Sequence, residues 1–212
     1  MVMTQYAFAF DSSKCSGCKT CQVLCKETYK LPLENLYRRV LNYQGGSWKQ
    51  NENGTWVSQG HFGYFLSMAC NHCANPACVK ACPTGAMRKD SDTGIVWTDH
   101  DVCVGCRSCE LACPYGAPTF NTDERIMMKC NMCKDEVGGG NTPLCVSGCR
   151  DRALDFGTLE EMRAKYGDGD VEVEPMPANH TNPSLVLVPH RNAQKTGTGT
   201  GHIVNMEEEV DA

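Results

Sequence analysis

The stretch Cys103–Pro114, CVGCRSCELACP, has the spacing C-x2-C-x2-C-x3-C-P. This is the ligand spacing of a bacterial-type cubane iron–sulfur cluster. Three cysteines at successive intervals of three allow a tight loop to wrap around one cube, with backbone N–H groups directed at the sulfides. The fourth cysteine, Cys113, lies one helical turn further on and faces another way, and Pro114 fixes the chain where it leaves that ligand. The run therefore predicts an iron–sulfur site.

The chain has sixteen cysteines in 212 residues, and all sixteen fall into four groups of four. Each group offers three ligands in a loop and a fourth on a short helix, so the four groups predict four clusters. In two-cluster ferredoxins the fourth cysteine of such a run ligates the neighbouring cluster. The groups are Cys15, Cys18, Cys21 and Cys25; Cys70, Cys73, Cys78 and Cys82; Cys103, Cys106, Cys109 and Cys113; and Cys130, Cys133, Cys145 and Cys149.

Two other uses of so many cysteines are structural zinc and a disulfide framework. Zinc sites usually gather two cysteine pairs separated by a longer loop, unlike the run at Cys103. A disulfide framework belongs to secreted proteins, but the N-terminus lacks the features of a signal peptide. The composition, 41% hydrophobic and 8% aromatic, favours metal sites, because metal-binding free energy contributes to folding.

The charge and hydropathy of the chain argue against two other classes, nucleic-acid-binding proteins and membrane-spanning proteins. The net charge of −5 and the absence of a basic stripe argue against nucleic-acid binding. No apolar stretch approaches the roughly 20 residues that cross a bilayer, so we expect no direct membrane span.

Outside the cysteine groups, the pattern predicts an α+β fold with short helices and small β-hairpins. Alternation over 6–10 predicts a strand, and 94–98 another. The segment 43–65 predicts a hairpin insertion with turns at Gly45-Gly46 and Asn53-Gly54 and with its aromatic residues in the core. Thr158 and Glu161 form the capping box of a helix.

The last part, residues 167–212, contains no cysteine and four scattered prolines, and it ends in an acidic run. It fits either a disordered tail or an extended strap lying on a partner subunit. We favour the strap, because the apolar residues 185–188 are unsuited to free solvent.

The chain resembles the four-cluster ferredoxin-type iron–sulfur (B) subunits of membrane-bound molybdopterin oxidoreductases, and within that family the dimethyl sulfoxide reductase branch. The likeness covers roughly residues 4 to 165. The matching stretches are FDSSKCSGCKTCQVLCK (10–26), CNHCANPAC (70–78), CPTGAM (82–87), VCVGCRSCELACPYGAP (102–118) and RALDFG (152–157). One departure is Arg150, where many relatives have proline after the last cysteine.

The resemblance implies how the ligands pair. Groups one and four would exchange their last cysteines to form one two-cluster module (1–60 and 125–166), and groups two and three would form the other (61–124). Some relatives have tryptophan and a three-iron cluster at the position of Cys106, so cysteine here implies four [4Fe-4S] clusters. The implied sets are Cys15, Cys18, Cys21 and Cys149; Cys130, Cys133, Cys145 and Cys25; Cys70, Cys73, Cys78 and Cys113; and Cys103, Cys106, Cys109 and Cys82.

The resemblance also implies a function: a non-catalytic subunit of an anaerobic respiratory complex, relaying single electrons. The donor would be a quinol-oxidising membrane anchor, and the acceptor a molybdopterin catalytic subunit that reduces dimethyl sulfoxide or a related S- or N-oxide. The alternatives are the relay subunit of a polysulfide, formate or nitrite enzyme, and a free polyferredoxin.

We expect association with the membrane through these partners. Co-export with the catalytic subunit would place the protein on the periplasmic face, with the cytoplasmic face as the alternative. Six cations flank ligands and would either raise cluster potentials or be solvated: Lys14, Lys19, Lys26, Arg107, Lys129 and Lys134.

Overall fold

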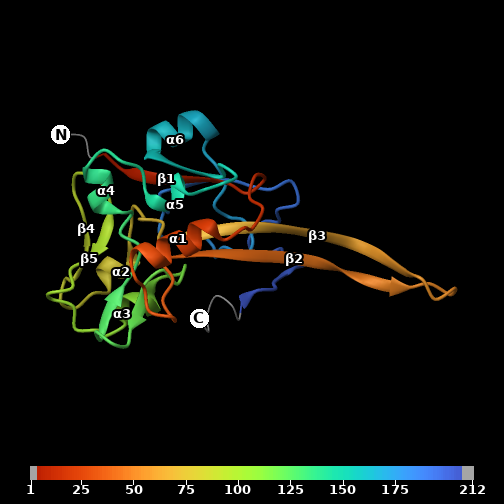
Figure 1. Cartoon of the computed structure of the whole chain (residues 1–212), viewed down its shortest axis with the longest axis horizontal. Helices are drawn as coiled ribbons and strands as arrows, with labels where there is room; N and C mark the ends of the chain where they lie inside the picture. Colours follow the sequence, from red (N-terminus) through yellow and green to blue (C-terminus); the bar gives the residue numbers. More distant parts are fainter. Residues whose placement is uncertain (1–3, 207–212) are drawn as a thin grey trace.

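The computed structural model of the protein describes residues 4–206, so the acidic end predicted for the tail lies outside the described residues. Short helices and small sheets alternate with the loops that carry the cysteines (Figure 1). This arrangement confirms the predicted α+β, ferredoxin-type fold. The helices are α1 (Thr20–Thr28), α2 (Ala77–Lys80), α3 (Ser108–Ala112), α4 (Lys134–Gly138), α5 (Leu144–Ser147) and α6 (Leu159–Tyr166).

A three-stranded sheet of order β8-β1-β9 contains the predicted first strand. β1 (Tyr6–Asp11) pairs antiparallel with β8 (Leu154–Thr158) and parallel with β9 (Leu185–Val188). Successive side chains of a strand face opposite sides, and here both sides are covered. Phe8 and Phe10 join the main core, whereas Ala9 packs with Met162 of α6 on the other face.

The predicted capping box starts α6. The Thr158 hydroxyl accepts a hydrogen bond from the Glu161 N–H at 3.2 Å, and the Thr158 N–H donates to Glu161 Oε2 at 2.8 Å. These bonds satisfy two backbone groups that a helix end leaves unpaired.

The strand β9 shows that part of the tail is covered within this chain, and the expectation that the tail lies on a partner subunit stays a prediction. Val186 and Leu187 are fully buried within this chain, because β9 adds to the edge of β1. Further on, β10 (His202–Ile203) pairs antiparallel with β2 (Arg38–Gln50). The sequence showed that 185–188 needed cover, but only the sheet shows that β1 supplies it.

The predicted hairpin insertion is longer than expected. β2 pairs with β3 (Trp56–Ala69) along an arm that projects far from the body of the molecule (Figure 1). The turn at Asn53-Gly54 is confirmed: Gly54 has φ 81° and its N–H donates to Asn51 O at 2.9 Å. The turn predicted at Gly45-Gly46 is wrong, since the register shifts between Gly45 and Ser47 as in a β-bulge.

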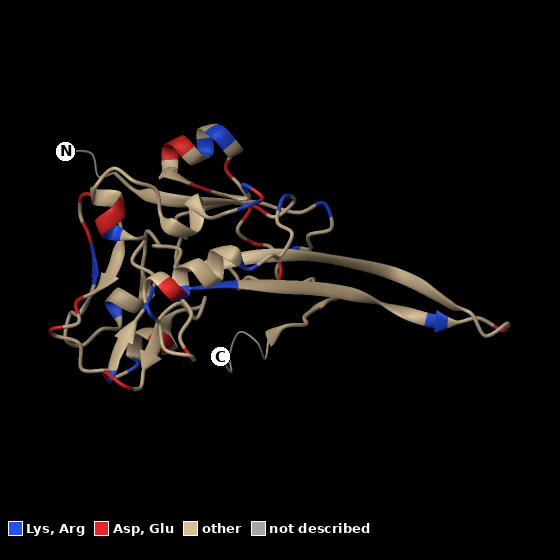
Figure 2. Cartoon of the chain, viewed as in Figure 1, with Lys and Arg blue, Asp and Glu red and all other residues tan. Residues whose placement is uncertain are grey.

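Aromatic residues divide along this arm. At its base Tyr43 and Tyr64 are buried, which confirms their place in the core. Near its tip Trp48 and Trp56 are 59% and 63% exposed, so the prediction of core positions is wrong for them. The outer arm carries few charged residues (Figure 2).

Two small hairpins complete the fold. β4 (Met87–Lys89) pairs with β5 (Val96–Thr98), and β6 (Thr119–Asn121) pairs with β7 (Ile126–Met128). Met87, Val96 and Met127 from these hairpins pack with Cys78 and Cys109 in a second, smaller core. The core is therefore built around the cysteines.

Candidate metal centres

All sixteen cysteines lie in the described part of the chain, and none of them forms a disulfide. A disulfide framework therefore does not describe this structure. The thiols gather into four sets, each with three members from one sequence group and a fourth from another group.

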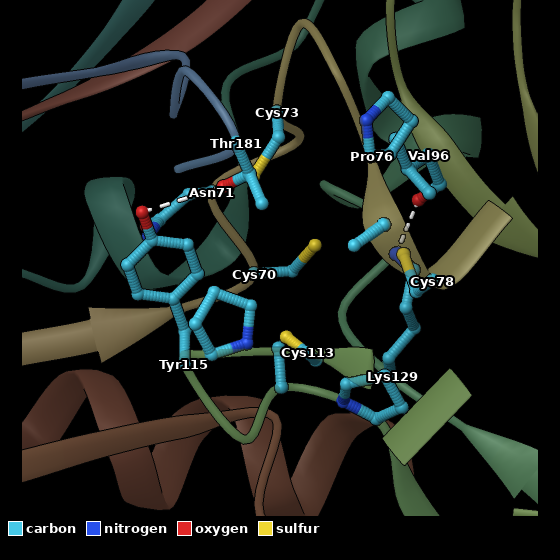
Figure 3. A pocket seen from close by; sticks show the side chains of 14 residues that line it. Cys70, Asn71, Cys73, Pro76, Cys78, Val96, Cys113, Tyr115, Lys129 and Thr181 are labelled. Carbon is cyan, nitrogen blue, oxygen red and sulfur yellow. Dashed lines mark hydrogen bonds between the residues drawn. The ribbon is translucent and has the colours of Figure 1, made fainter. Parts of the chain in front are cut away.

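One set surrounds a small cavity. The thiols of Cys70, Cys73 and Cys78 come from the second sequence group, and Cys113 comes from the third. Figure 3 shows these cysteines around the cavity, with Tyr115 on one side of it and Lys129 on the opposite side. The Thr181 hydroxyl donates a hydrogen bond to Cys73 Sγ at 3.2 Å, so the tail contributes to this site.

The reciprocal set surrounds a second small cavity and contains Cys82 together with Cys103, Cys106 and Cys109. Backbone N–H groups point at the sulfurs: Met87 donates to Cys82 Sγ and Met127 to Cys103 Sγ, both at 3.4 Å. Helices α2 and α3 pack together, and this contact lets each group supply its last cysteine to the other.

A third small cavity is lined by Cys15, Cys18, Cys21 and Cys149. The Ala153 N–H donates to Cys149 Sγ at 3.2 Å. Cys21 Sγ lies 3.3 Å from the Ser67 hydroxyl, which reaches it from β3. The base of the long arm is therefore part of this site.

The remaining set consists of Cys25, Cys130, Cys133 and Cys145, and all four are buried. Burial, together with the nearby Cys130, Cys145 and Cys133, raises the pKa of Cys25. Helices α1 and α5 pack against each other and bring the first and fourth sequence groups together. The Met132 N–H donates to Cys130 Sγ at 3.4 Å.

Two glycines permit the tight ligand loops, at matching positions in the first and third groups. Gly17 and Gly105 have φ +72° and +65°, which L residues rarely adopt. A Cβ on Gly105 would lie 2.2 Å from Arg125 O, and one on Gly17 would lie 2.4 Å from the Phe65 ring. Sequence reasoning overlooked both, although the repeated x-Gly-Cys within the motif was a visible signal.

One residue at these sites, His72, had no signal in the sequence. His72 is fully buried, accepts a hydrogen bond from the Val96 N–H at Nδ1 (2.9 Å), and has Nε2 3.9 Å from Cys130 Sγ. Lys129 is also buried, and its ammonium donates to Val96 O and Cys130 O. The interpretation of the flanking cations as solvated is therefore wrong for Lys129, whereas Lys134 is exposed and its ammonium lies 4.4 Å from the centre of the Trp97 ring.

Burial disfavours the ionised form of most of these thiols. It raises the pKa of Cys78 and Cys130 to about 12, and that of Cys15 and Cys73 to about 11. In contrast, hydrogen bonding with Ser108 lowers the pKa of the exposed Cys106. Several buried thiolates side by side require a cation, which thiolate-binding metals supply.

The sets suit a ligand larger than one ion. Three of them enclose cavities instead of converging on a point, and among residues 4–206 no three His, Cys, Asp or Glu side chains form a group that holds a single metal ion. Four sulfurs around a cavity, with N–H donors aimed at them, fit an iron–sulfur cube.

Comparison with known proteins agrees with this geometry. The model of a family described as the 4Fe-4S dicluster domain matches residues 61–159. The B subunit of the anaerobic dimethyl sulfoxide reductase of Escherichia coli is 50% identical over 206 residues, which cover 97% of this chain and 98% of the relative. This protein belongs to the same family of iron–sulfur subunits.

Other relatives extend the comparison. The B subunit of the anaerobic dimethyl sulfoxide reductase of Haemophilus influenzae is 44% identical, covering 97% of this chain and all of the relative. The thiosulfate reductase electron transfer subunit PhsB of Salmonella typhi is 36% identical, covering 80% of this chain and 84% of the relative.

The family and its domain make this an iron–sulfur, electron-transfer subunit that is not catalytic by itself. When bound, a cluster with four thiolate ligands has no open coordination position and exchanges single electrons. Within residues 4–206, none of the helices has the length and apolar character to span a membrane.

Proposed function

We propose that the protein binds four [4Fe-4S] clusters and relays single electrons through them. The observation that carries this proposal is the gathering of sixteen thiols into four sets of three plus one. The proposed ligands of clusters one to four are Cys15, Cys18, Cys21 and Cys149; Cys130, Cys133, Cys145 and Cys25; Cys70, Cys73, Cys78 and Cys113; and Cys103, Cys106, Cys109 and Cys82.

The exchange of last cysteines supports two ferredoxin modules, residues 1–60 with 125–166 and residues 61–124. Contacts between α1 and α5 belong to the first module, and contacts between α2 and α3 to the second. His72 joins them, because it belongs to the second module and contacts Cys130 of the first.

The proposed relay has two exposed ends and a buried middle. Of the sixteen cysteines, Cys18 and Cys106 are exposed, and they belong to the sites of clusters one and four. Clusters two and three would lie between them, since Cys130 Sγ of one site lies 3.9 Å from Nε2 of His72, which stands between Cys70 and Cys73 of the other site in the chain. A linear order from cluster one to cluster four follows.

We propose that the cluster-four end faces a quinol-oxidising membrane anchor. Exposed apolar side chains surround that end: Val102 at 40%, Val104 at 65% and Leu111 at 88%. Such a group of side chains on one loop and helix suits an apolar protein surface.

The cluster-one end is mainly polar, apart from the exposed Val23. There Ser16 donates to Asp151, and Arg150 pairs with Asp151 at 3.3 Å. This end suits a soluble molybdopterin catalytic subunit that reduces dimethyl sulfoxide or a related S- or N-oxide. The names of relatives in the dimethyl sulfoxide branch favour this substrate over that of the thiosulfate relative. Co-export with the catalytic subunit would place the complex on the periplasmic face.

Metal and sulfide analysis with a reductive titration tests the proposal. The purified complex should contain about sixteen irons and sixteen sulfides in this chain, at four of each per cube. Low-temperature electron paramagnetic resonance should resolve four clusters, and the isolated chain should reduce no dimethyl sulfoxide. Zinc in place of iron would overturn the proposal. Retention of the protein in membranes without any larger partner would overturn its place in a complex.

A further inference from the structure

A single arginine lies between the sites proposed for clusters one and two. Arg38 begins β2 and is only 3% exposed. Its Nη1 donates to Ser67 O at 3.1 Å and to Ser67 Oγ at 3.0 Å, and its guanidinium carbon lies 4.7 Å from the centre of the Phe8 ring. The base of the arm thus holds a positive charge inside the core.

This charge has no carboxylate partner within residues 4–206. The ion pairs of that region do not include Arg38, and its Nε and Nη2 atoms have no hydrogen-bond partner there. A buried guanidinium is strongly unfavourable unless an opposite charge and hydrogen-bond acceptors accompany it. The structure therefore calls for a negative group next to Arg38.

Four cysteines from the proposed sites lie close enough to Arg38 for a thiolate to favour the charged guanidinium. They are Cys145, Cys21, Cys130 and Cys25. Cys21 belongs to the proposed site of cluster one, and the other three belong to that of cluster two. Ser67 extends the contact, because its hydroxyl lies between Arg38 Nη1 and Cys21 Sγ, 3.0 and 3.3 Å away.

We propose that Arg38 is a fixed counter-charge shared by clusters one and two, which raises the reduction potentials of both. The proposal rests on the proposed function, since it needs thiolate-bound clusters at these sites. Reduction adds an electron, and a nearby cation in a low-dielectric interior stabilises the more negative state. Arginine suits this role because its charge is permanent.

The test is a potentiometric titration of the intact complex carrying Arg38→Gln, followed by electron paramagnetic resonance. Cluster signals are first assigned through Cys18→Ser for cluster one and Cys133→Ser for cluster two. We expect the reduced-to-oxidised ratio of clusters one and two at a fixed potential to fall at least tenfold, equivalent to about 59 mV for one electron. Clusters three and four should keep their potentials.

Matched variants separate charge from structure. Arg38→Lys keeps the positive charge, so clusters one and two should have potentials close to those of the unmodified complex. Arg39→Gln removes the neighbouring guanidinium, which donates to Tyr115 O and Gly116 O, and should leave clusters one and two unchanged. Unchanged potentials in an Arg38→Gln complex with full iron content would overturn the proposal.

If the complex that carries Arg38→Gln does not assemble, the Ser67→Ala variant provides the test instead. Loss of the hydroxyl between Arg38 and Cys21 should lower the potential of cluster one while cluster four is unaffected, and no change would overturn the proposal. Iron content and signal count of the unmodified complex test the clusters themselves. A failure of the proposed function is therefore distinct from a failure of the role of Arg38.

Discussion

At the scale of single residues, the ligand loops depend on backbone conformations that only glycine adopts easily. Gly105 illustrates this most clearly. Its φ is +65°, and Arg125 O lies only 2.2 Å from the position that a Cβ would take. Strain of this kind costs roughly 1–3 kcal/mol for a non-glycine residue. The clash with a carbonyl oxygen adds to that cost, because backbone cannot rotate away as a side chain can.

Gly105→Ala should therefore impair the fourth proposed cluster selectively. We expect iron content to fall from about sixteen to about twelve per chain as one cube is lost. The midpoint of thermal unfolding should also fall. Gly140→Ala is the matched control, because Gly140 has φ +81° but nothing lies within 4 Å of its Cβ position. Equal iron loss in both variants would refute the role assigned to Gly105.

At the scale of secondary-structure elements, the long arm has two structurally different parts, a base and an outer half. Its base contributes to the core and to the proposed sites, through Tyr64, Arg38 and Ser67. Its outer half exposes Trp48 and Trp56 and, among residues 4–206, makes no contribution to the core. Substitutions in the base of the arm should therefore lower stability more than substitutions in its outer half.

Tyr64→Ala should destabilise the protein by about 3–5 kcal/mol, the range for losing a buried aromatic ring. The ring is 3% exposed and its hydroxyl donates to Glu174 O at 2.7 Å. Trp48→Ser combined with Trp56→Ser should change stability by less than about 0.5 kcal/mol per site. Denaturant unfolding of the iron-loaded protein measures both. A large loss in the double variant would show that the tip packs against the body.

The helix α6 is held to its sheet by a carboxylate. Asp155 of β8 accepts hydrogen bonds from Lys165 Nζ at 2.6 Å and from Tyr166 OH at 2.7 Å. Burial raises the pKa of Asp155, but these two bonds outweigh it and leave the pKa below its ordinary value. Its contribution to stability is therefore present above the unfolded-state pKa and lost as the pH falls through the folded-state value.

Asp155→Asn should loosen α6 by about 1 kcal/mol, a typical net value for one hydrogen bond to a charged group at a partly exposed site. Hydrogen exchange of the amides in α6 at neutral pH measures this loss, and the amides of β3 serve as the reference. The difference between the variant and the unmodified protein should shrink as the pH is lowered toward about 3.9, at pH values where visible absorption shows that the clusters are still bound. A difference that persists at low pH would contradict the charge-based account.

At the scale of the whole molecule, the cysteines are part of the core. Cys21, Cys25, Cys130, Cys145 and Cys149 lie in the main core with the buried aromatic residues, and Cys78 and Cys109 lie in the smaller one. A protein with few large apolar residues thus surrounds its proposed clusters with what hydrophobic surface it has. Metal binding and folding should be coupled.

Removal of iron should therefore unfold the protein rather than leave an empty scaffold. We expect a chelator under anaerobic, mildly acidic conditions to abolish near-ultraviolet circular dichroism together with the visible absorption of the clusters. Simultaneous loss of both signals is the predicted result. A fully folded iron-free protein would show that the apolar core is sufficient.

The sequence by itself determined the chemistry, because cysteine spacing within a loop is a local property. The run Cys103–Pro114 indicates an iron–sulfur site without any tertiary information, and the same holds for the Thr158 capping box and the first strand. Only the tertiary structure decided which elements meet. It placed Leu185–Val188 beside β1, exposed Trp48 and Trp56, and brought Arg38 and Ser67 next to Cys21. These contacts join residues that are far apart in the chain, and a local sequence pattern contains no information about which distant residues pack against it.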